Sequence, residues 1–270
     1  MRTRESRIVD GRPCPVPSPS RPTRPRPPPP RRRTSNPDLT RPIAPNLRRS
    51  LGLPTEIGFH DIFGFEPDLL AMVPQPTHAI LLLFPITEAS EKARLEHAST
   101  RNDDDAASDL VSPGVWFTRQ TIGNACGTIG VLHAVANTQH EYSIADDSWF
   151  ARFFAATSTM TPAERAAHLE ADDSLEAAHA GAASSVASST AVPTPDEEVD
   201  LHFVALVHVD GGLYELDGRK EAPVRHGDTS AESFLLDAGA VVKKFVQAGG
   251  DSLSFNAIAM GPSAGGDAMF

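Results

Sequence analysis

The segment LHFVALVHVDGGLYELD, residues 201–217, does most to determine the fold of this chain. Residues 201–209 alternate in the manner of a β-strand and are rich in branched and aromatic side chains. Asp210-Gly211 then offers a two-residue turn, and apolar residues return at 213–216. We therefore expect a β-hairpin closed by that turn.

The register of this hairpin brings two polar residues together. If Asp210 and Gly211 form the turn, Val204 pairs with Asp217, and His202 is the diagonal neighbour of Asp217 on the same face. Diagonal Cβ atoms lie about 7–8 Å apart, within reach of an imidazole and a carboxylate. The hairpin can thus hold an oriented His–Asp pair. Such residues are also common in hairpins without catalysis, and this geometry alone leaves both interpretations open.

Outward from the hairpin, the apolar pattern predicts further strands and helices. We expect strands at 59–65, 78–86, 115–119 and 253–260. We expect helices at about 125–137 and 231–247, a helical turn at 67–72, and a helix that starts at the capping box Thr161-Pro-Ala-Glu164. Asn124 is the expected N-cap of the first of these helices. Strands and helices without regular alternation indicate the α+β class.

Composition divides the 270-residue chain into unequal parts. Residues 12–33 are almost entirely Pro, Arg, Ser and Thr and cannot build a core. We expect a disordered tail at 1–34, one domain at 35–262 and a short C-terminal tail at 263–270. The N-terminal tail is expected to be passive, although its P-x-x-P spacings could dock in an aromatic groove. Residues 180–200, rich in Ala, Ser, Thr and Pro, are typical of a lid or mobile loop.

Charge and cysteine content restrict the partners and the compartment. Residues 1–50 carry 13 Arg and 3 acidic residues, while the other 220 carry 11 basic and 32 acidic residues. An acidic body disfavours nucleic acid and favours a basic partner, although it also simply confers solubility. Two cysteines exclude a disulfide framework, and the apolar runs are too short for a membrane span. We expect a soluble cytoplasmic protein that could also be present in the nucleus.

Cys126 is the candidate nucleophile. It lies in the first turn of the helix expected at 125–137, where the unpaired N–H groups and the positive end of the dipole lower the pKa of a thiol. Gly123, Gly127 and Gly130 surround it and would let a substrate backbone approach. A cysteine on an apolar helix face is also typical of a small buried hydrophobic residue.

Gln120 lies six residues before Cys126. It could donate a hydrogen bond from its side-chain amide to the oxyanion of a tetrahedral intermediate, although loop glutamines without such a role are more frequent.

A serine nucleophile of the G-x-S-x-G type and a metal site are both excluded. Residues 261–265 match the G-x-S-x-G pattern, but too little chain follows for the required helix and histidine. No H-E-x-x-H or Cys-pair spacing favours a metal, so neither a metal nor another cofactor is expected.

Several motifs together resemble the ubiquitin carboxyl-terminal hydrolase family. QTIGNACGTIG at 120–130 is similar to the nucleophile motif of that family, and DLHFVALVHVDGGLYELDGRK at 200–220 to its His–Asp hairpin. FEPDLLAMVPQPTHAILLLFPIT at 65–87, TMTPAERAAHLE at 159–170 and RHGDTS at 225–230 follow the family in the same order. The resemblance is nearly continuous from about Leu51 to Met260. The chain differs before Leu51, where Pro42 and Pro45 interrupt the helix that the family has there.

The resemblance implies a papain-like fold, with a central antiparallel sheet flanked by helices, and a thiol peptidase. It makes Cys126 the nucleophile, His202 the general base, Asp217 the residue that orients His202, and Gln120 the oxyanion donor. The implied partner is ubiquitin, or a ubiquitin-like modifier, and the implied reaction releases small esters, thioesters, amides or short peptides from its C-terminal glycine. We expect a monomer without nucleic-acid or membrane partners. A ubiquitin-binding module with little or no turnover is the alternative function.

Overall fold

The computed structural model describes residues 51–92, 114–123, 125–172, 201–248 and 255–263. The chain divides into two units, Met1–Thr34 and Ser35–Phe270, and all described residues belong to the second. The expected N-terminal tail, the loop at 180–200 and all but the first residue of the expected C-terminal tail lie outside the described residues. Their boundaries, and those of the expected domain, stay predictions.

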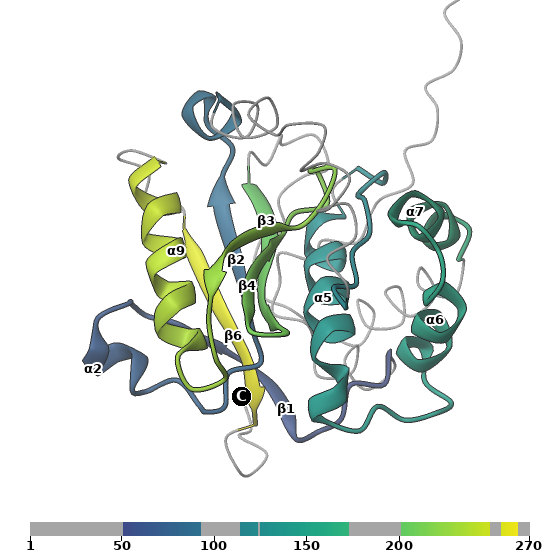
Figure 1. Ribbon diagram of the computed structural model, residues 1–270, viewed down its shortest axis with the longest axis horizontal. Helices are drawn as coiled ribbons and strands as arrows, with labels where there is room; N and C mark the ends of the chain where they lie inside the picture. The colour runs from purple at the N-terminus through teal and green to yellow at the C-terminus, as the bar shows by residue number, and fades with distance from the viewer. Residues whose placement is uncertain (1–50, 93–113, 124, 173–200, 249–254, 264–270) are drawn as a thin grey trace, which may run out of the picture. The chain divides into compact units, whose positions relative to one another are not determined.

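A six-stranded antiparallel sheet is the central element of the described part (Figure 1). Its strands are β1 (Ile57–Asp61), β2 (Ala79–Pro85), β3 (Leu201–Val209), β4 (Gly212–Leu216), β5 (Val224–Asp228) and β6 (Asn256–Pro262). They lie side by side in the order β1-β6-β2-β3-β4-β5, and every pairing is antiparallel. The expected α+β class with a central antiparallel sheet is confirmed.

Helices lie on both sides of this sheet. They are α2 (Pro67–Leu70), α5 (Cys126–Thr138), the 3-10 turn η1 (Gln139–Glu141), α6 (Trp149–Thr157), α7 (Pro162–Glu170) and α9 (Phe234–Ala248). Figure 1 shows α9 on one side of the sheet and α5 on the other, with α6 and α7 beyond α5. Within the described ranges, no helix is both long and apolar enough to cross a membrane.

The sheet separates two hydrophobic cores, and β3 contributes to both because successive strand residues point to opposite faces. Phe203, Ala205 and Val207 belong to the core on the α5 side. Val204 and Leu206 belong to the core on the α9 side. All five are buried, so β3 is a central strand whose two faces are both covered.

The hairpin expected from the sequence is confirmed. Val209 pairs with Gly212, and the register continues to Ala205 opposite Leu216. The turn residues Asp210 and Gly211 have φ values of 47° and 76°. Positive φ at both central positions is the geometry that follows the twist of a two-residue hairpin.

The predicted strand at 115–119 is wrong, because these residues belong to no strand. Their backbone groups find side chains instead of a neighbouring strand. Trp116 N–H donates to Asn137 Oδ1 at 2.7 Å, and Asn137 Nδ2 donates to the Trp116 carbonyl at 2.8 Å. Thr118 N–H donates to His133 Nε2 at 3.1 Å. Two buried side chains of α5 therefore replace a strand partner.

Helix starts were predicted with mixed success. The capping box is confirmed, since Thr161 Oγ1 accepts from Glu164 N–H at 3.3 Å and Glu164 Oε2 accepts from Thr161 N–H at 2.8 Å. The N-cap assignment to Asn124 is wrong, because α5 begins at Cys126 and Ala125 occupies the cap without a side-chain hydrogen bond. The cap of a helix is set by backbone conformation, which composition alone does not fix.

Several boundaries also differ from prediction. The first strand occupies Ile57–Asp61 instead of 59–65, because the chain leaves the sheet before Phe63, which is 78% exposed. The last strand starts three residues later than expected, as does α9, whereas α2 and β2 lie within their predicted ranges. No sequence pattern indicated α6 or β5; α6 is capped by Ser148, whose hydroxyl accepts from Ala151 N–H at 3.1 Å.

Candidate active site

Cys126 occupies the first position of α5 and is half-buried. The helix lies close to the sheet at Gly130, where an added Cβ would meet Leu81 and Phe203 side-chain atoms at 3.5 and 3.7 Å. The N–H groups of the first helical turn have no acceptor within the helix, and they give that end of the helix a positive partial charge. Burial raises the pKa of the Cys126 thiol, but a hydrogen bond with His202 and backbone hydrogen bonds from Phe203 and Gly127 outweigh it, so the pKa lies below its ordinary value.

His202 and Asp217 are brought together as the hairpin register predicts. His202 is the second residue of β3, and Asp217 follows the last residue of β4. Nε2 of His202 lies 2.6 Å from Oδ1 of Asp217, and the two side chains are only 3% and 4% exposed. The imidazole also lies nearly perpendicular to the ring of Phe84 on β2, with centroids 5.7 Å apart. The pair is therefore held in a largely water-free setting.

Asp217 stays ionised in this buried position. Burial raises the pKa of its carboxyl, but the hydrogen bond and charge of His202 lower it, as does the backbone N–H of Arg219, which donates to Oδ1 at 2.9 Å. The net pKa lies below the ordinary value. A carboxylate that accepts two hydrogen bonds at one oxygen has little freedom to turn, so its direction relative to His202 is fixed.

His202 also contacts Cys126. Burial lowers the pKa of His202, but hydrogen bonds with Asp217 and Cys126 raise it to about 9. Because Nε2 faces Asp217, Nδ1 is the ring nitrogen left for the thiol. The thiol pKa is lowered while the imidazole pKa is raised, so a thiolate–imidazolium pair is favoured between them.

Gln120 lies beside the turn that follows Asp217. Its backbone N–H donates to the Gly218 carbonyl at 2.8 Å. Its side-chain Nε2 donates to the Ile122 carbonyl at 3.2 Å, while Oε1 is buried without a hydrogen-bond partner. A buried polar atom without a partner is uncommon and marks an amide that can still gain interactions.

The segment before Gln120 is anchored by residues that the sequence analysis missed. Besides Asn137 and His133, Arg165 of α7 donates through Nη1 to the Phe117 carbonyl at 2.8 Å, and its guanidinium lies 5.0 Å from the Trp116 ring centroid. Asn137 and His133 are four residues apart on a buried helix. Two polar residues four positions apart within an apolar helix were the signal in the sequence. Such side chains must find hydrogen-bond partners when they are buried, and this would have pointed to a neighbouring backbone segment.

Other chemistry finds little support near this site. Among the residues that the structure describes, no group of three or more His, Cys, Asp or Glu side chains could hold a metal ion.

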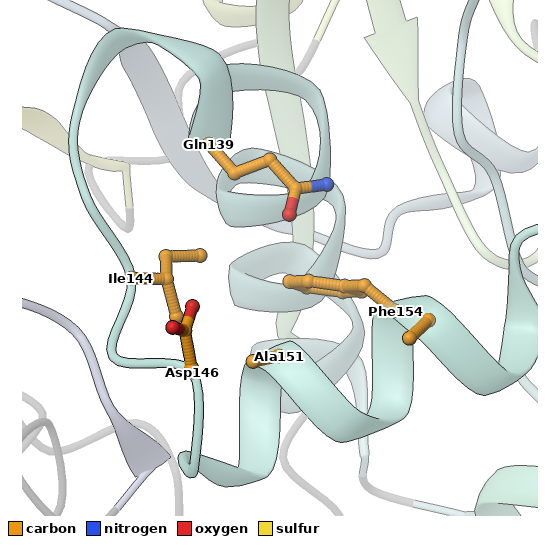
Figure 2. Close-up of a pocket in the computed structure, with 6 residues that line it drawn as sticks. Gln139, Ile144, Asp146, Ala151 and Phe154 are labelled. Carbon is orange, nitrogen blue, oxygen red and sulfur yellow. The ribbon is translucent and has the colours of Figure 1, made fainter.

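A pocket of about 450 Å³ lies away from Cys126. It is lined by the residues Gln139, Ile144, Asp146, Ala151, Phe154 and Ala155 (Figure 2). Gln139 follows the C-terminal end of α5, and a helix of 13 residues is about 20 Å long, so this pocket is remote from Cys126.

Comparison with known proteins gives consistent matches. The family model described as ubiquitin carboxyl-terminal hydrolase, family 1, matches residues 34–247. Ubiquitin carboxyl-terminal hydrolase 3 of Arabidopsis thaliana is 43% identical over 227 residues, which cover 84% of this chain and 91% of that protein. Ubiquitin carboxyl-terminal hydrolase isozyme L1 of Rattus norvegicus is 39% identical over 210 residues, or 78% of this chain and 90% of that one.

The fold is similar to that of solved structures. The Trichinella spiralis UCH37 catalytic domain bound to ubiquitin vinyl methyl ester matches with a TM-score of 0.60 and 21% sequence identity, over 85% of this chain and 94% of that one. A second structure, UCH37 of the same organism bound to the same ubiquitin derivative, gives a TM-score of 0.58 at 19% identity, over 85% of this chain and 80% of that one. At these identities the likeness establishes the fold.

Proposed function

The chain belongs to the ubiquitin carboxyl-terminal hydrolase family and is a cysteine-type ubiquitin hydrolase, and on that basis we propose that Cys126, His202 and Asp217 carry out its reaction. The observation that carries the proposal is the His202–Asp217 hydrogen bond of 2.6 Å, together with the interaction of the Cys126 thiol with the same imidazole. A nucleophile, a base and a group that orients the base form the arrangement that activates a thiol.

In this proposal the Cys126 thiolate attacks the carbonyl carbon of the C-terminal glycine of ubiquitin. The His202 imidazolium gives its proton to the leaving group, and a thioester between Cys126 and ubiquitin remains. A water molecule then loses a proton to neutral His202 and attacks the thioester, which releases ubiquitin and the thiolate. Asp217 supports both steps, because its charge stabilises the imidazolium and its acceptor oxygen fixes the direction of the ring.

Gln120 is the proposed oxyanion donor. Its Nε2 donates to the Ile122 carbonyl over a long 3.2 Å hydrogen bond, which a negatively charged oxygen would outcompete. The N–H groups at the start of α5 are suited to the same role, since they point out of the helix end that Cys126 begins. A donor of this kind contributes about 2.7–4 kcal/mol in the transition state.

The substrates we propose are small adducts of ubiquitin: esters, thioesters, amides and short peptide extensions. The relatives are named ubiquitin carboxyl-terminal hydrolases, and both similar structures are bound to a ubiquitin derivative, which supports ubiquitin as the partner. The excess of acidic residues outside the first 50 suits a basic partner. We further propose that the protein acts as a monomer in the cytoplasm, where a reducing environment keeps the Cys126 thiol free.

The test uses ubiquitin with a C-terminal fluorogenic amide and ubiquitin vinyl methyl ester. Cys126→Ala should abolish turnover and adduct formation but retain ubiquitin binding, because the thiol acts in chemistry and adds little uniform binding. Cys14→Ala, which removes the other cysteine, is the matched control and should behave as wild type. Turnover by Cys126→Ala would refute the proposed nucleophile. The proposed preference for small adducts is tested by comparing the small amide with ubiquitin fused to a folded protein. Equal rates of hydrolysis on the two substrates would contradict it.

A further inference from the structure

A buried carboxylate that the proposed chemistry does not use lies next to Asp217. Glu215 lies on β4, two positions before Asp217, which follows the end of that strand. Glu215 is only 2% exposed. Burial raises the pKa of its carboxyl, but the Lys220 charge and a hydrogen bond with His226 outweigh this effect, so the pKa lies below its ordinary value. An ionised buried carboxylate is stable only while such partners remain in place.

Both partners lie within hydrogen-bonding distance. Nζ of Lys220 is 2.5 Å from Oε1 of Glu215, and Nε2 of His226 on β5 is 2.8 Å from Oε2. Lys220 is 17% exposed and His226 20% exposed. Unlike ion pairs at the surface, this group is shielded from water, so its geometry is strongly defined.

Lys220 also ends the turn that begins at Asp217. Its backbone N–H donates to the Asp217 carbonyl at 2.9 Å, and the N–H of Arg219 between them donates to Asp217 Oδ1 at 2.9 Å. The Lys220 charge is among the causes that lower the pKa of Asp217. The lysine thus holds one end of the turn through the buried Glu215, and the same turn delivers the N–H that fixes the Asp217 carboxylate.

Neighbouring atoms restrict the position of the turn from Asp217 to Lys220. The Gly218 carbonyl accepts from Gln120 N–H at 2.8 Å, and a Cβ added at Gly218 would lie 2.9 Å from side-chain carbons of Gln120 and Ile129. The guanidinium of Arg219 is paired with Glu91 at 2.8 Å, but both side chains are about 30% exposed, so solvent weakens that link. Lys220 provides the buried anchor.

We propose that Lys220, bound to the buried Glu215, is a positioning residue that sets the direction of Asp217 and so the orientation of His202. This inference rests on the proposed function, because it assigns Lys220 an effect only through the role of Asp217. Lys220 itself touches neither the thiol nor the substrate in this scheme. Its loss should therefore lower kcat and leave KM almost unchanged, since the orientation of the base matters in the transition state.

The first experiment compares three lysine variants in the full chain with the fluorogenic ubiquitin amide. Lys220→Met should lower kcat about 10- to 100-fold with KM within about 3-fold. Lys220→Arg should recover most of the activity, because a guanidinium can still bind Glu215. Lys243→Met, the same change at an exposed position of α9, is the matched control and should keep wild-type kcat.

Two further variants separate positioning from stability. Lys220→Met leaves Glu215 with fewer partners, so the double variant Glu215→Gln/Lys220→Met, which removes both charges, is measured at a temperature where melting curves show it folded. It should show the same fall in kcat. In an Asp217→Asn background, Lys220→Met should lower kcat less than about 3-fold, because the residue through which it acts is already altered.

The outcomes distinguish the inference from the function on which it rests. If Asp217→Asn lowers kcat but folded Lys220→Met does not, Lys220 has no positioning role and the proposed function stands. If Lys220→Met lowers kcat as much in the Asp217→Asn background as it does in the wild type, the inference is also overturned, since Lys220 would then act independently of Asp217. If Asp217→Asn itself retains wild-type kcat, the role of Asp217 is wrong and the inference fails with it.

Discussion

Asp217→Asn is the perturbation that tests the proposed charge pair most directly. The asparagine has nearly the same shape, and its Oδ1 can still accept from His202 Nε2 and from Arg219 N–H, which lie 2.6 and 2.9 Å from the aspartate oxygen. What disappears is the negative charge. The variant therefore separates the electrostatic effect of Asp217 from its effect on packing.

The size of the effect follows from the pKa of His202. Burial lowers this pKa, yet the hydrogen bond and charge of Asp217, with those of Cys126, raise it to about 9 from an ordinary 6.5. That difference favours the imidazolium by about 3 kcal/mol. Without the Asp217 charge we expect this pKa to fall toward 6.5, because burial still lowers it and only the interaction with Cys126 still raises it. At pH 8 the imidazolium fraction, and with it kcat/KM, should then fall by up to roughly 30-fold, the limit reached if the pKa returns fully to 6.5.

The assay is kcat/KM for the fluorogenic ubiquitin amide from pH 5.5 to 10. In the wild type, activity should rise as the Cys126 thiol ionises and fall as His202 loses its proton near pH 9. The basic limb should move to lower pH in Asp217→Asn. Asp228→Asn, at an aspartate whose side chain is 92% exposed, is the matched control and should keep the wild-type profile. A basic limb that stays near pH 9 in Asp217→Asn would refute the reasoning.

Two further predictions concern the residues around the site. Burial lowers the pKa of His133 to about 4, so as pH falls below 6.5 the unfolded chain binds a proton that the folded chain does not. This group should make the free energy of unfolding about 2 kcal/mol smaller at pH 5 than at pH 8, and urea denaturation should show a weaker pH dependence in His133→Gln; equal dependence in both proteins would contradict this. Gly218→Ala should lower kcat about 10-fold, since its Cβ would press on Gln120, whereas Gly130→Ala, with no atom nearer than 3.5 Å, should keep wild-type kcat. Unchanged kcat in Gly218→Ala would mean that the turn can move freely.

Local features of the sequence were sufficient for the parts of the fold that depend on near neighbours. A turn of two residues with positive φ permits one register, so the placement of His202 against Asp217 could be predicted from the chain between them. The capping box at Thr161 is similarly local, because donor and acceptor are three residues apart. The catalytic roles themselves came from the resemblance to a family and stay predictions.

What the sequence could not determine depends on contacts between distant segments. Residues 115–119 have the composition of a strand, but only packing against α5 gives their backbone the side chains of His133 and Asn137 as partners. Nothing local reveals that Glu215 is buried, because an acidic residue in a short strand is typical of an exposed face.

The sequence by itself determined the hairpin, a helix at about 125–137 that carries Cys126 in its first turn, and the residue types able to perform thiol chemistry. Only the tertiary structure decided that Cys126 and His202, which are 76 positions apart, lie close enough to shift the pKa of each other. The physical reason is that α5 packs against β3, and burial of apolar surface between them fixes a geometry that neither segment adopts alone.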